Sequence, residues 1–271
     1  MILNVQGDHA YCYTGGKSFN PELPTAVFIH GAQNDHSVWA LQTRYFAHHG
    51  YGVLAIDLPG HGRSTGAPLK SVEAMSAWLL EVLDAAGVRQ AALIGHSMGS
   101  LIALETAFQA PRRVSKLAMV GTAYPMKVSE TLLDAAKNEV QRAIDMVNIW
   151  SLSSIAQKPS FPGPGFYVSS GGRRLMQRIA QQNSEPVFHT DFSACNAYAN
   201  GEIAARSVTC PTLLLLGKKD MMTSPRQTAT LTNAMPHAKV TQLENCGHQL
   251  MAEQPDAVLD TLFAFAKQQQ K

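Results

Sequence analysis

The chain has 271 residues, of which 45% are hydrophobic and 15% are charged. This composition supports a buried core and excludes a disordered chain, and the length allows one large α/β domain or a core domain with a sizeable insertion. The formal net charge is only +2, from 22 basic and 20 acidic residues spread along the chain. Because no basic cluster is present to bind phosphates, we expect no nucleic-acid partner.

The N-terminal segment and the cysteines indicate the compartment. The first residues do not show the basic stretch and apolar stretch of a signal peptide, and no apolar run approaches the ~20 residues that cross a bilayer. The four cysteines, Cys12, Cys195, Cys210 and Cys246, lack the spacing of a metal site or a disulfide framework. We therefore expect a cytoplasmic protein with reduced thiols and no membrane span. The sequence leaves the oligomeric state open, with a homodimer as one alternative.

Short apolar runs alternate with helical patterns over the first part of the chain. Strands are predicted at 25–31, 51–60, 90–96 and 114–121, and helices at 37–50, 71–86 and 98–110. Such alternation predicts a mostly parallel sheet with helices on both faces.

The alternation stops after Gly121 and resumes near residue 210. Between them, helical stretches are predicted at 130–147 and 173–182, separated by a segment rich in Pro and Gly, with no clear buried strand. The later elements are a strand at 210–217, a helix near 224–235, a strand at 239–244 and a final helix from about Pro255. We therefore predict a core made of residues 1–122 and 208–271, with a mainly helical insertion of residues 123–207 folded on top.

The stretch GHSMG places Ser97 between Gly95 and Gly99, where a predicted strand meets a predicted helix. An ordinary turn is one interpretation. The other is a nucleophile elbow, in which the two glycines let the helix start pack close to the strand while the serine occupies a strained bend.

Two later residues favour the elbow. Asp220 follows the strand at 210–217, and His248 follows the strand at 239–244, so both are expected at the carboxyl edge of the sheet. A serine hydroxyl needs a base to take its proton and a carboxylate to orient that base. The order Ser97, Asp220, His248 is the order of hydrolases that carry this elbow. We predict that these three residues form a catalytic triad.

Cleavage of an acyl compound also requires donors for the developing oxyanion. The backbone N–H of Met98, directly after the serine, is the first candidate. The second is the N–H of Ala32, because Gly31 allows a sharp turn after the strand at 25–31. We expect His30 to be a structural hydrogen-bonding residue and the side chain of His96 to point away from the site, toward the core. The ten histidines show no zinc-ligand spacing, so no metal is expected.

Together these motifs resemble the α/β-hydrolase fold superfamily over nearly the whole chain outside the insertion. The matching segments are HGAQNDHSVW, DLPGHGRS, GHSMG, LLLLGKKDMMTSP and NCGH. The resemblance implies that residues 57–64 form a loop at the site edge and that the insertion is a cap, or lid, over the pocket. Dehalogenases and epoxide hydrolases of this fold carry an aspartate where Ser97 stands, so their activities are not implied. The HGA segment, in place of the HGGG of many lipases, suits smaller and more enclosed substrates.

The sequence thus predicts a serine hydrolase that cleaves carboxylic esters of small to medium apolar substrates through an acyl-enzyme, without a cofactor. Candidate substrate-binding residues are Phe161, Phe166, Tyr167 and Met221, although these side chains could equally pack the cap against the core. Other reactions on the same triad stay open: carbon–carbon bond hydrolysis of ring-cleavage products, a cofactor-free perhydrolase or haloperoxidase-like reaction, and acyl transfer. An alternative of another class is a small-molecule-binding receptor with incidental turnover.

Overall fold

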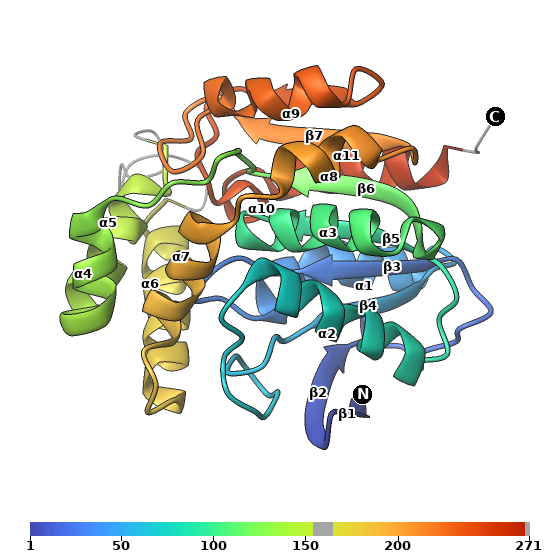
Figure 1. Ribbon diagram of the computed structural model, residues 1–271, viewed down its shortest axis with the longest axis horizontal. Coiled ribbons are helices and arrows are strands. Elements are labelled where there is room, and N and C mark those ends of the chain that lie inside the picture. The colour runs from blue at the N-terminus through green and yellow to red at the C-terminus, as the bar shows by residue number, and fades with distance from the viewer. Residues whose placement is uncertain (154–164, 269–271) are drawn as a thin grey trace.

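A computed structural model describes residues 1–153 and 165–268 of the chain. Among these residues the strands form one eight-stranded sheet in the order β1-β2-β4-β3-β5-β6-β7-β8 (Figure 1). The strands are β1 (Ile2–Val5), β2 (Asp8–Tyr13), β3 (Thr25–Ile29), β4 (Gly52–Ile56), β5 (Ala91–His96), β6 (Val114–Val120), β7 (Thr212–Gly217) and β8 (Lys239–Leu243). All neighbouring pairs from β4 to β8 are parallel. The predicted mostly parallel sheet is therefore confirmed.

The N-terminal hairpin was not predicted. β1 pairs antiparallel with β2, and β2 pairs antiparallel with β4, which extends the sheet by two strands at one edge. Gln6 and Gly7, which join β1 to β2, have φ values of 55° and 88°. Positive φ at both central residues is the geometry of the two-residue turns that match strand twist.

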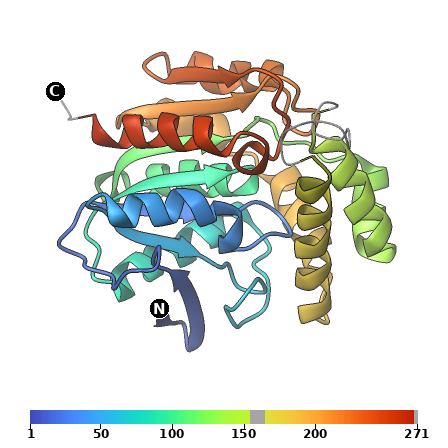
Figure 2. The same cartoon turned by 180° about the vertical axis from the view of Figure 1, so that it is seen from behind.

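Helices cover both faces of the sheet because its strands present apolar side chains to both. In β3, Val27 and Ile29 belong to one core, while Ala26 and Phe28 belong to the other. α2 (Val72–Ala85), α3 (Met98–Gln109) and α8 (Gly201–Ser207) cover the first face (Figure 1), and α1 (Ala40–His48) and α11 (Pro255–Lys267) cover the second (Figure 2). The shorter elements are α9 (Ala229–Ala234), α10 (Leu250–Glu253) and the 3₁₀ turns His36–Trp39, Pro111–Arg113 and Pro225–Thr228.

Four helices that follow β6 gather at the carboxyl ends of the parallel strands (Figure 1). These inserted helices are α4 (Glu130–Asn138), α5 (Val140–Trp150), α6 (Gly165–Gln182) and α7 (Val187–Ala197). They have a small core of their own, which includes Leu132, Ile144, Met176 and Phe188. The next helix, α8, packs against α3 and α9. The limits of the insertion at 123 and 207 stay a prediction.

The inserted helices differ from the predicted elements in three places. α6 begins at Gly165, within the segment rich in Pro and Gly, and not at 173. The stretch predicted as one helix over 130–147 is two helices, because Glu139 has φ −138° and ψ 58° and the chain leaves helical geometry there. α7 was not predicted at all. Every helix of the described ranges is too short or too polar to span a lipid bilayer.

Candidate active site

Ser97 occupies a strained turn between β5 and α3. Its φ of 53° and ψ of −120° lie where residues with a side chain are rare. A Cβ atom on Gly95 would lie 2.0 Å from the Gly99 carbonyl oxygen, and one on Gly99 would lie 2.4 Å from the Ile29 carbonyl oxygen. Both flanking glycines are therefore required for the backbone to pass so closely, which is the geometry of a nucleophile elbow.

Asp220 and His248 follow adjacent parallel strands, β7 and β8, and meet at the carboxyl edge of the sheet. The His248 Nδ1–H donates to Asp220 Oδ2 over 2.8 Å. The backbone N–H groups of Met222 and Thr223 donate to Asp220 Oδ1, and the Thr223 hydroxyl donates to Oδ2, each over 2.8 Å. Burial would raise the pKa of Asp220, but the charge and hydrogen bond of His248 and the bonds from Thr223 outweigh it and hold this pKa below its ordinary value. Asp220 is thus an ionised acceptor at neutral pH.

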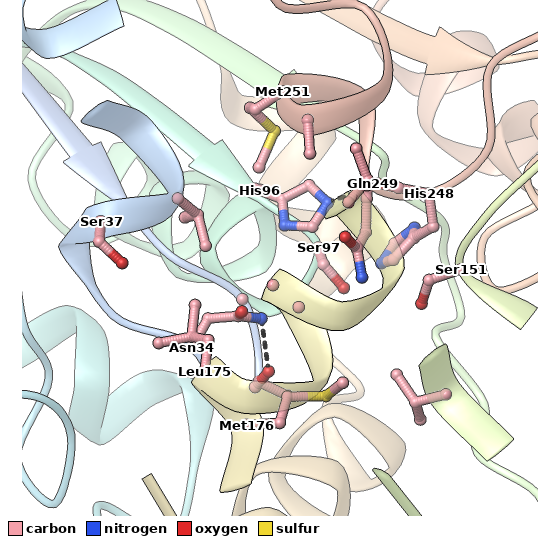
Figure 3. Close-up of a pocket in the computed structure, with 18 of the residues that line it drawn as sticks. Asn34, Ser37, His96, Ser97, Ser151, Leu175, Met176, His248, Gln249 and Met251 are labelled. Atoms are coloured by element: carbon pink, nitrogen blue, oxygen red, sulfur yellow. Dashed lines mark hydrogen bonds between the residues drawn. The ribbon is translucent and has the colours of Figure 1, made fainter. Parts of the chain in front are cut away.

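The bond to Asp220 sets the tautomer of His248. Because Nδ1 carries the hydrogen, Nε2 of neutral His248 carries a lone pair and is able to take a proton. Ser97 and His248 line the same cavity, and Figure 3 shows both side chains reaching into it, with Gln249 beside them. The backbone N–H of His248 donates to the Ser151 carbonyl at the end of α5 over 2.7 Å. The structure therefore brings the three predicted triad residues to one site.

The expectation for His96 was wrong, because its side chain lines the cavity instead of pointing away from it. Its ring centroid lies 4.7 Å from that of His248, and its Nε2–H donates to the His248 carbonyl over 2.8 Å. Burial, and next the neighbouring His248, lower the pKa of His96 to about 3, so the ring is neutral. Gly121 leaves room for this arrangement: a Cβ atom there would lie 3.3 Å from His96 Cδ2 and 3.3 Å from His248 Nδ1.

The loop of residues 31–35 follows β3 and passes against the elbow. The sheet register pairs Ile29 of β3 with Gly95 of β5, and a Cβ atom on Gly31 would lie only 3.1 Å from Ser97 Cβ. Within the described residues, the backbone N–H groups of Ala32 and Met98 donate to no protein acceptor. Ala32 and Ser97 line the same cavity, and an oxyanion site requires donors that are free in this way.

Side chains and backbone of the inserted helices hold this loop from the other side. The Gln33 N–H donates to Asp191 Oδ2 over 2.8 Å, and the Gln33 side-chain amide donates to the Met176 carbonyl over 3.0 Å. Arg178 forms an ion pair with Asp35. Sequence reasoning missed Asp191, and nothing in the surrounding letters VFHTDFSAC distinguishes it from a surface aspartate on a helix.

The cavity has a volume of about 580 Å³ and is bounded by both the core and the inserted helices. Among its described lining residues none is acidic, and Arg174 and Arg178 of α6 are the arginines. Its apolar lining comes mainly from residues that the sequence did not single out, namely Val147, Leu175, Met176, Phe188, Phe192 and Met251. A smaller hollow of about 170 Å³ shares four lining residues with the cavity, namely Ala32, Ser97, Phe192 and Met222.

The predicted substrate-binding residues have different positions. Tyr167 lines the cavity but is 82% exposed, and Met221 lines the smaller hollow and is 72% exposed. Both therefore lie at openings and not deep in the pocket. Phe161 and the side chain of Phe166 lie outside the described residues.

Two further groups are engaged in hydrogen bonds within the protein. His30, as expected, is structural: its Nδ1–H donates to the Gly31 carbonyl, and its Nε2 accepts from the Leu58 N–H over 3.1 Å. Ligand atoms of Asp35, His36 and Asp57 lie within 4.8 Å of one another, the one such group among the described residues. However, the backbone N–H and Nδ1 of His36 both bind Asp57 Oδ1, and Asp35 pairs with Arg178. These side chains join two loops at the site edge, as their hydrogen bonds show.

Comparisons with known proteins identify the fold. A family model described as the alpha/beta hydrolase fold matches residues 24–255. The chain is 24% identical to 3-oxoadipate enol-lactonase 1 of Acinetobacter baylyi, over 98% of this chain and 96% of the relative. It is 25% identical to a pimeloyl-[acyl-carrier protein] methyl ester esterase of Nitrosospira multiformis, over 91% and 95% of the two chains. The crystal structure of the enol-lactonase from Burkholderia xenovorans superposes with a TM-score of 0.85 at 21% identity, covering 99% of this chain and 100% of that one.

Proposed function

Since this chain belongs to the alpha/beta hydrolase fold family and is a hydrolase of that fold, we propose that it is a serine hydrolase that cleaves carboxylic esters through an acyl-enzyme. The observation that carries the proposal is the hydrogen-bonded Asp220–His248 pair beside the Ser97 elbow, on one cavity. The free N–H groups of Ala32 and Met98 support it, because they provide donors for an oxyanion. No cofactor is required.

The reaction follows from the proton positions. Ser97 Oγ attacks the ester carbonyl carbon while His248 Nε2 takes the hydroxyl proton. Asp220 keeps the imidazole oriented and stabilises it when charged, and the N–H groups of Ala32 and Met98 bind the oxyanion. As the tetrahedral intermediate collapses, His248 gives its proton to the leaving alkoxide and an acyl-enzyme remains. His248 then takes a proton from water, the hydroxide attacks the acyl carbon, and the carboxylic acid is released with Ser97 restored.

The cavity supports small to medium substrates with an apolar body. Its volume of about 580 Å³ lies in the ordinary range for small-molecule sites, and aliphatic and aromatic side chains line much of it. In this proposal the inserted helices are a cap over the pocket, with Tyr167 and Met221 at its openings. Phe161 and Phe166 remain predicted substrate-binding residues.

Replacing the nucleophile tests the proposal most directly. Ser97→Ala is expected to lower kcat on p-nitrophenyl esters by a factor of about 10⁴ or more, because His248 and Asp220 then have no serine hydroxyl to activate. A fluorophosphonate should label the unmodified protein on the peptide that contains Ser97 and leave the variant unlabelled. Circular dichroism and Tm should match between the two proteins.

Retained ester turnover in the folded Ser97→Ala variant contradicts the proposal. Saturable ligand binding with negligible turnover of every ester in a panel of acyl lengths, and no fluorophosphonate label, would favour the receptor alternative instead.

A further inference from the structure

Asp191 is a buried carboxylate of α7 that reaches out of the inserted helices to the core. It is 0% exposed, and its Oδ2 accepts from the Gln33 N–H over 2.8 Å and from the His61 Nε2–H over 2.9 Å. Its Oδ1 has no hydrogen-bond partner within the described ranges. A buried carboxylate is costly unless a charge and hydrogen bonds compensate it, so these two donors account for its position.

His61 supplies the compensating charge. Its Nδ1 lies 3.1 Å from the Pro59 carbonyl and its Nε2 lies 2.9 Å from Asp191. Both partners are acceptors, so both ring nitrogens carry hydrogen and the ring is an imidazolium. Burial acts to lower the pKa of His61, but Asp191, the Pro59 carbonyl and Asp57 raise it above its ordinary value. The His30 ring, 4.9 Å away, is neutral because burial lowers its pKa to about 4.

The Gln33 N–H belongs to the Ala32–Gln33 peptide group, and its hydrogen bond to Asp191 fixes one side of that group. On the other side of that group, the Ala32 carbonyl accepts from Asn34 Nδ2 over 2.8 Å. Gln33 has a φ of 55°, which a residue with a side chain adopts only when its surroundings hold it there. Because the Ala32 N–H belongs to the preceding peptide group, fixing the Ala32–Gln33 group restricts the direction of that N–H.

We propose that Asp191, with His61 as its counter-charge, is a positioning residue that holds the Ala32–Gln33 peptide so that the Ala32 N–H points at the substrate oxyanion. The inference rests on the proposed ester hydrolysis. In this arrangement a side chain of α7, Asp191, aligns an N–H donor of the core, that of Ala32. Asp191 itself touches neither the substrate nor the reacting atoms.

The experiment compares Asp191→Ala, Asp191→Asn and a matched control. Asp191→Ala removes the acceptor for the Gln33 N–H and should lower kcat on p-nitrophenyl butyrate by about 10- to 100-fold, with KM changed less than about 3-fold. Asp191→Asn keeps an acceptor oxygen and should recover kcat to within about 5-fold of the unmodified protein. A trifluoromethyl ketone, which forms a tetrahedral oxyanion on the serine, should lose affinity in proportion to kcat/KM across the three proteins.

Tyr198→Phe is the control. The Tyr198 hydroxyl, directly after α7, donates to Glu105 Oε2 of α3 over 2.7 Å, so the variant weakens the attachment of the same helix without touching the 31–35 loop. Its kcat and its affinity for the trifluoromethyl ketone should stay within about 3-fold. If Asp191→Ala fails to fold, His61→Gln serves in its place, because it removes the counter-charge and leaves Gln33 its acceptor. It should lower kcat and ketone affinity together by about 3- to 10-fold.

Three outcomes overturn the inference. The first is Asp191→Ala with kcat and ketone affinity within 2-fold of the unmodified protein. The second is an equal loss for the ketone and for a non-electrophilic substrate analogue, which indicates a loosened pocket. The third is the same loss in Tyr198→Phe. Ser97→Ala separates the two proposals: if it retains turnover, the ester hydrolysis itself fails, whereas an inactive Ser97→Ala with a fully active Asp191→Ala removes only the role of Asp191.

Discussion

The acid–histidine pair and the 31–35 loop serve the same cavity but are held in place differently. Asp220 is bound by residues two and three positions further along, Met222 and Thr223, and by His248 on the next strand. Gln33 is bound by Asp191 and Met176, which are 158 and 143 residues away in the chain. The acid therefore depends on local loop geometry and on the sheet, whereas the proposed oxyanion donor depends on how the inserted helices dock.

The histidine loop combines both kinds of support. It follows β8, yet the backbone N–H groups of His248 and Gln249 both donate to the Ser151 carbonyl at the end of α5. Glu253 adds a second link, because its carboxylate accepts from the N–H groups of Gly247 and Ser153 over 2.9 and 3.0 Å. The inserted helices thus contact two of the loops that line the cavity.

The largest effect is expected from a substitution of Asp220, which nearby residues hold in place. Asp220→Asn should lower kcat by about 10⁴-fold, because an amide oriented by the Met222 and Thr223 N–H groups presents its NH₂ to His248 Nδ1 and selects the wrong tautomer. Steady-state kinetics on p-nitrophenyl butyrate measure this. Thr223→Val is the matched control, since it removes only the hydroxyl donor and should cost less than about 10-fold. A variant Asp220→Asn within 10-fold of the unmodified protein would mean that this pair is not the acid and base.

The close contact between the elbow and β3 can be tested at Gly99. Gly99→Ala places a Cβ atom 2.4 Å from the Ile29 carbonyl oxygen, so the elbow must move away from β3 and from the 31–35 loop. We expect the free energy of unfolding to fall by about 3 kcal/mol or more, as measured by urea denaturation. Gly171→Ala in α6 is the control: a Cβ atom there meets nothing within 4 Å, so stability should rise by about 0.5–1 kcal/mol. Equal stability of the two variants would contradict the close approach at Gly99.

Two buried histidines allow a test by pH. Burial lowers the pKa of His30 to about 4 from 6.5, so between these values the unfolded chain binds a proton that the folded chain does not. The free energy of unfolding should therefore fall with decreasing pH by about 1.4 kcal/mol per unit for this proton. His61, whose pKa is raised, has the opposite sign: its contribution is present below its unfolded pKa and is lost as pH rises through its folded pKa.

Urea denaturation at several pH values between 8.5 and 4.5 measures these contributions. His30→Gln should flatten the decline in stability below about pH 6.5, whereas His61→Gln should remove the loss of stability that the unmodified protein shows as pH rises above about 6.5. Both variants acting in the same pH range would show that the rings do not carry different charges.

The smallest effect is expected from a substitution in the 31–35 loop, at Asn34. Asn34→Ala removes the donor to the Ala32 carbonyl but leaves the Gln33 bond to Asp191. Loss of one of two hydrogen bonds to the peptide group should reduce kcat by about 3- to 10-fold at unchanged Tm. A larger loss than in Asp191→Ala would make Asn34 the main support of the loop.

The features that the sequence predicted are those encoded by neighbouring residues. Apolar runs such as 25–29 and 91–96 locate the central strands, and strand ends bring Ser97, Asp220 and His248 to one edge of the sheet. His96 was misplaced because its position depends on the missing side chain at Gly121, directly after β6. Asp191 was missed because its partners, Gln33 and His61, are 158 and 130 residues away and leave no periodic signal.

The bare backbone at Gly121 offers a way to discover the natural ligand. β6 lies between the strand that precedes Ser97 and those that precede Asp220 and His248, so the imidazole must cross its end to reach the hydroxyl. Gly121 has a φ of 54° and is not among the residues that line the cavity. A methyl group there would lie 3.3 Å from His248 Nδ1, the atom that binds Asp220, so Gly121→Ala is expected to displace the base. A protein with a displaced base would bind its substrate without cleaving it, and the bound compound could then be identified by mass spectrometry of a cell extract.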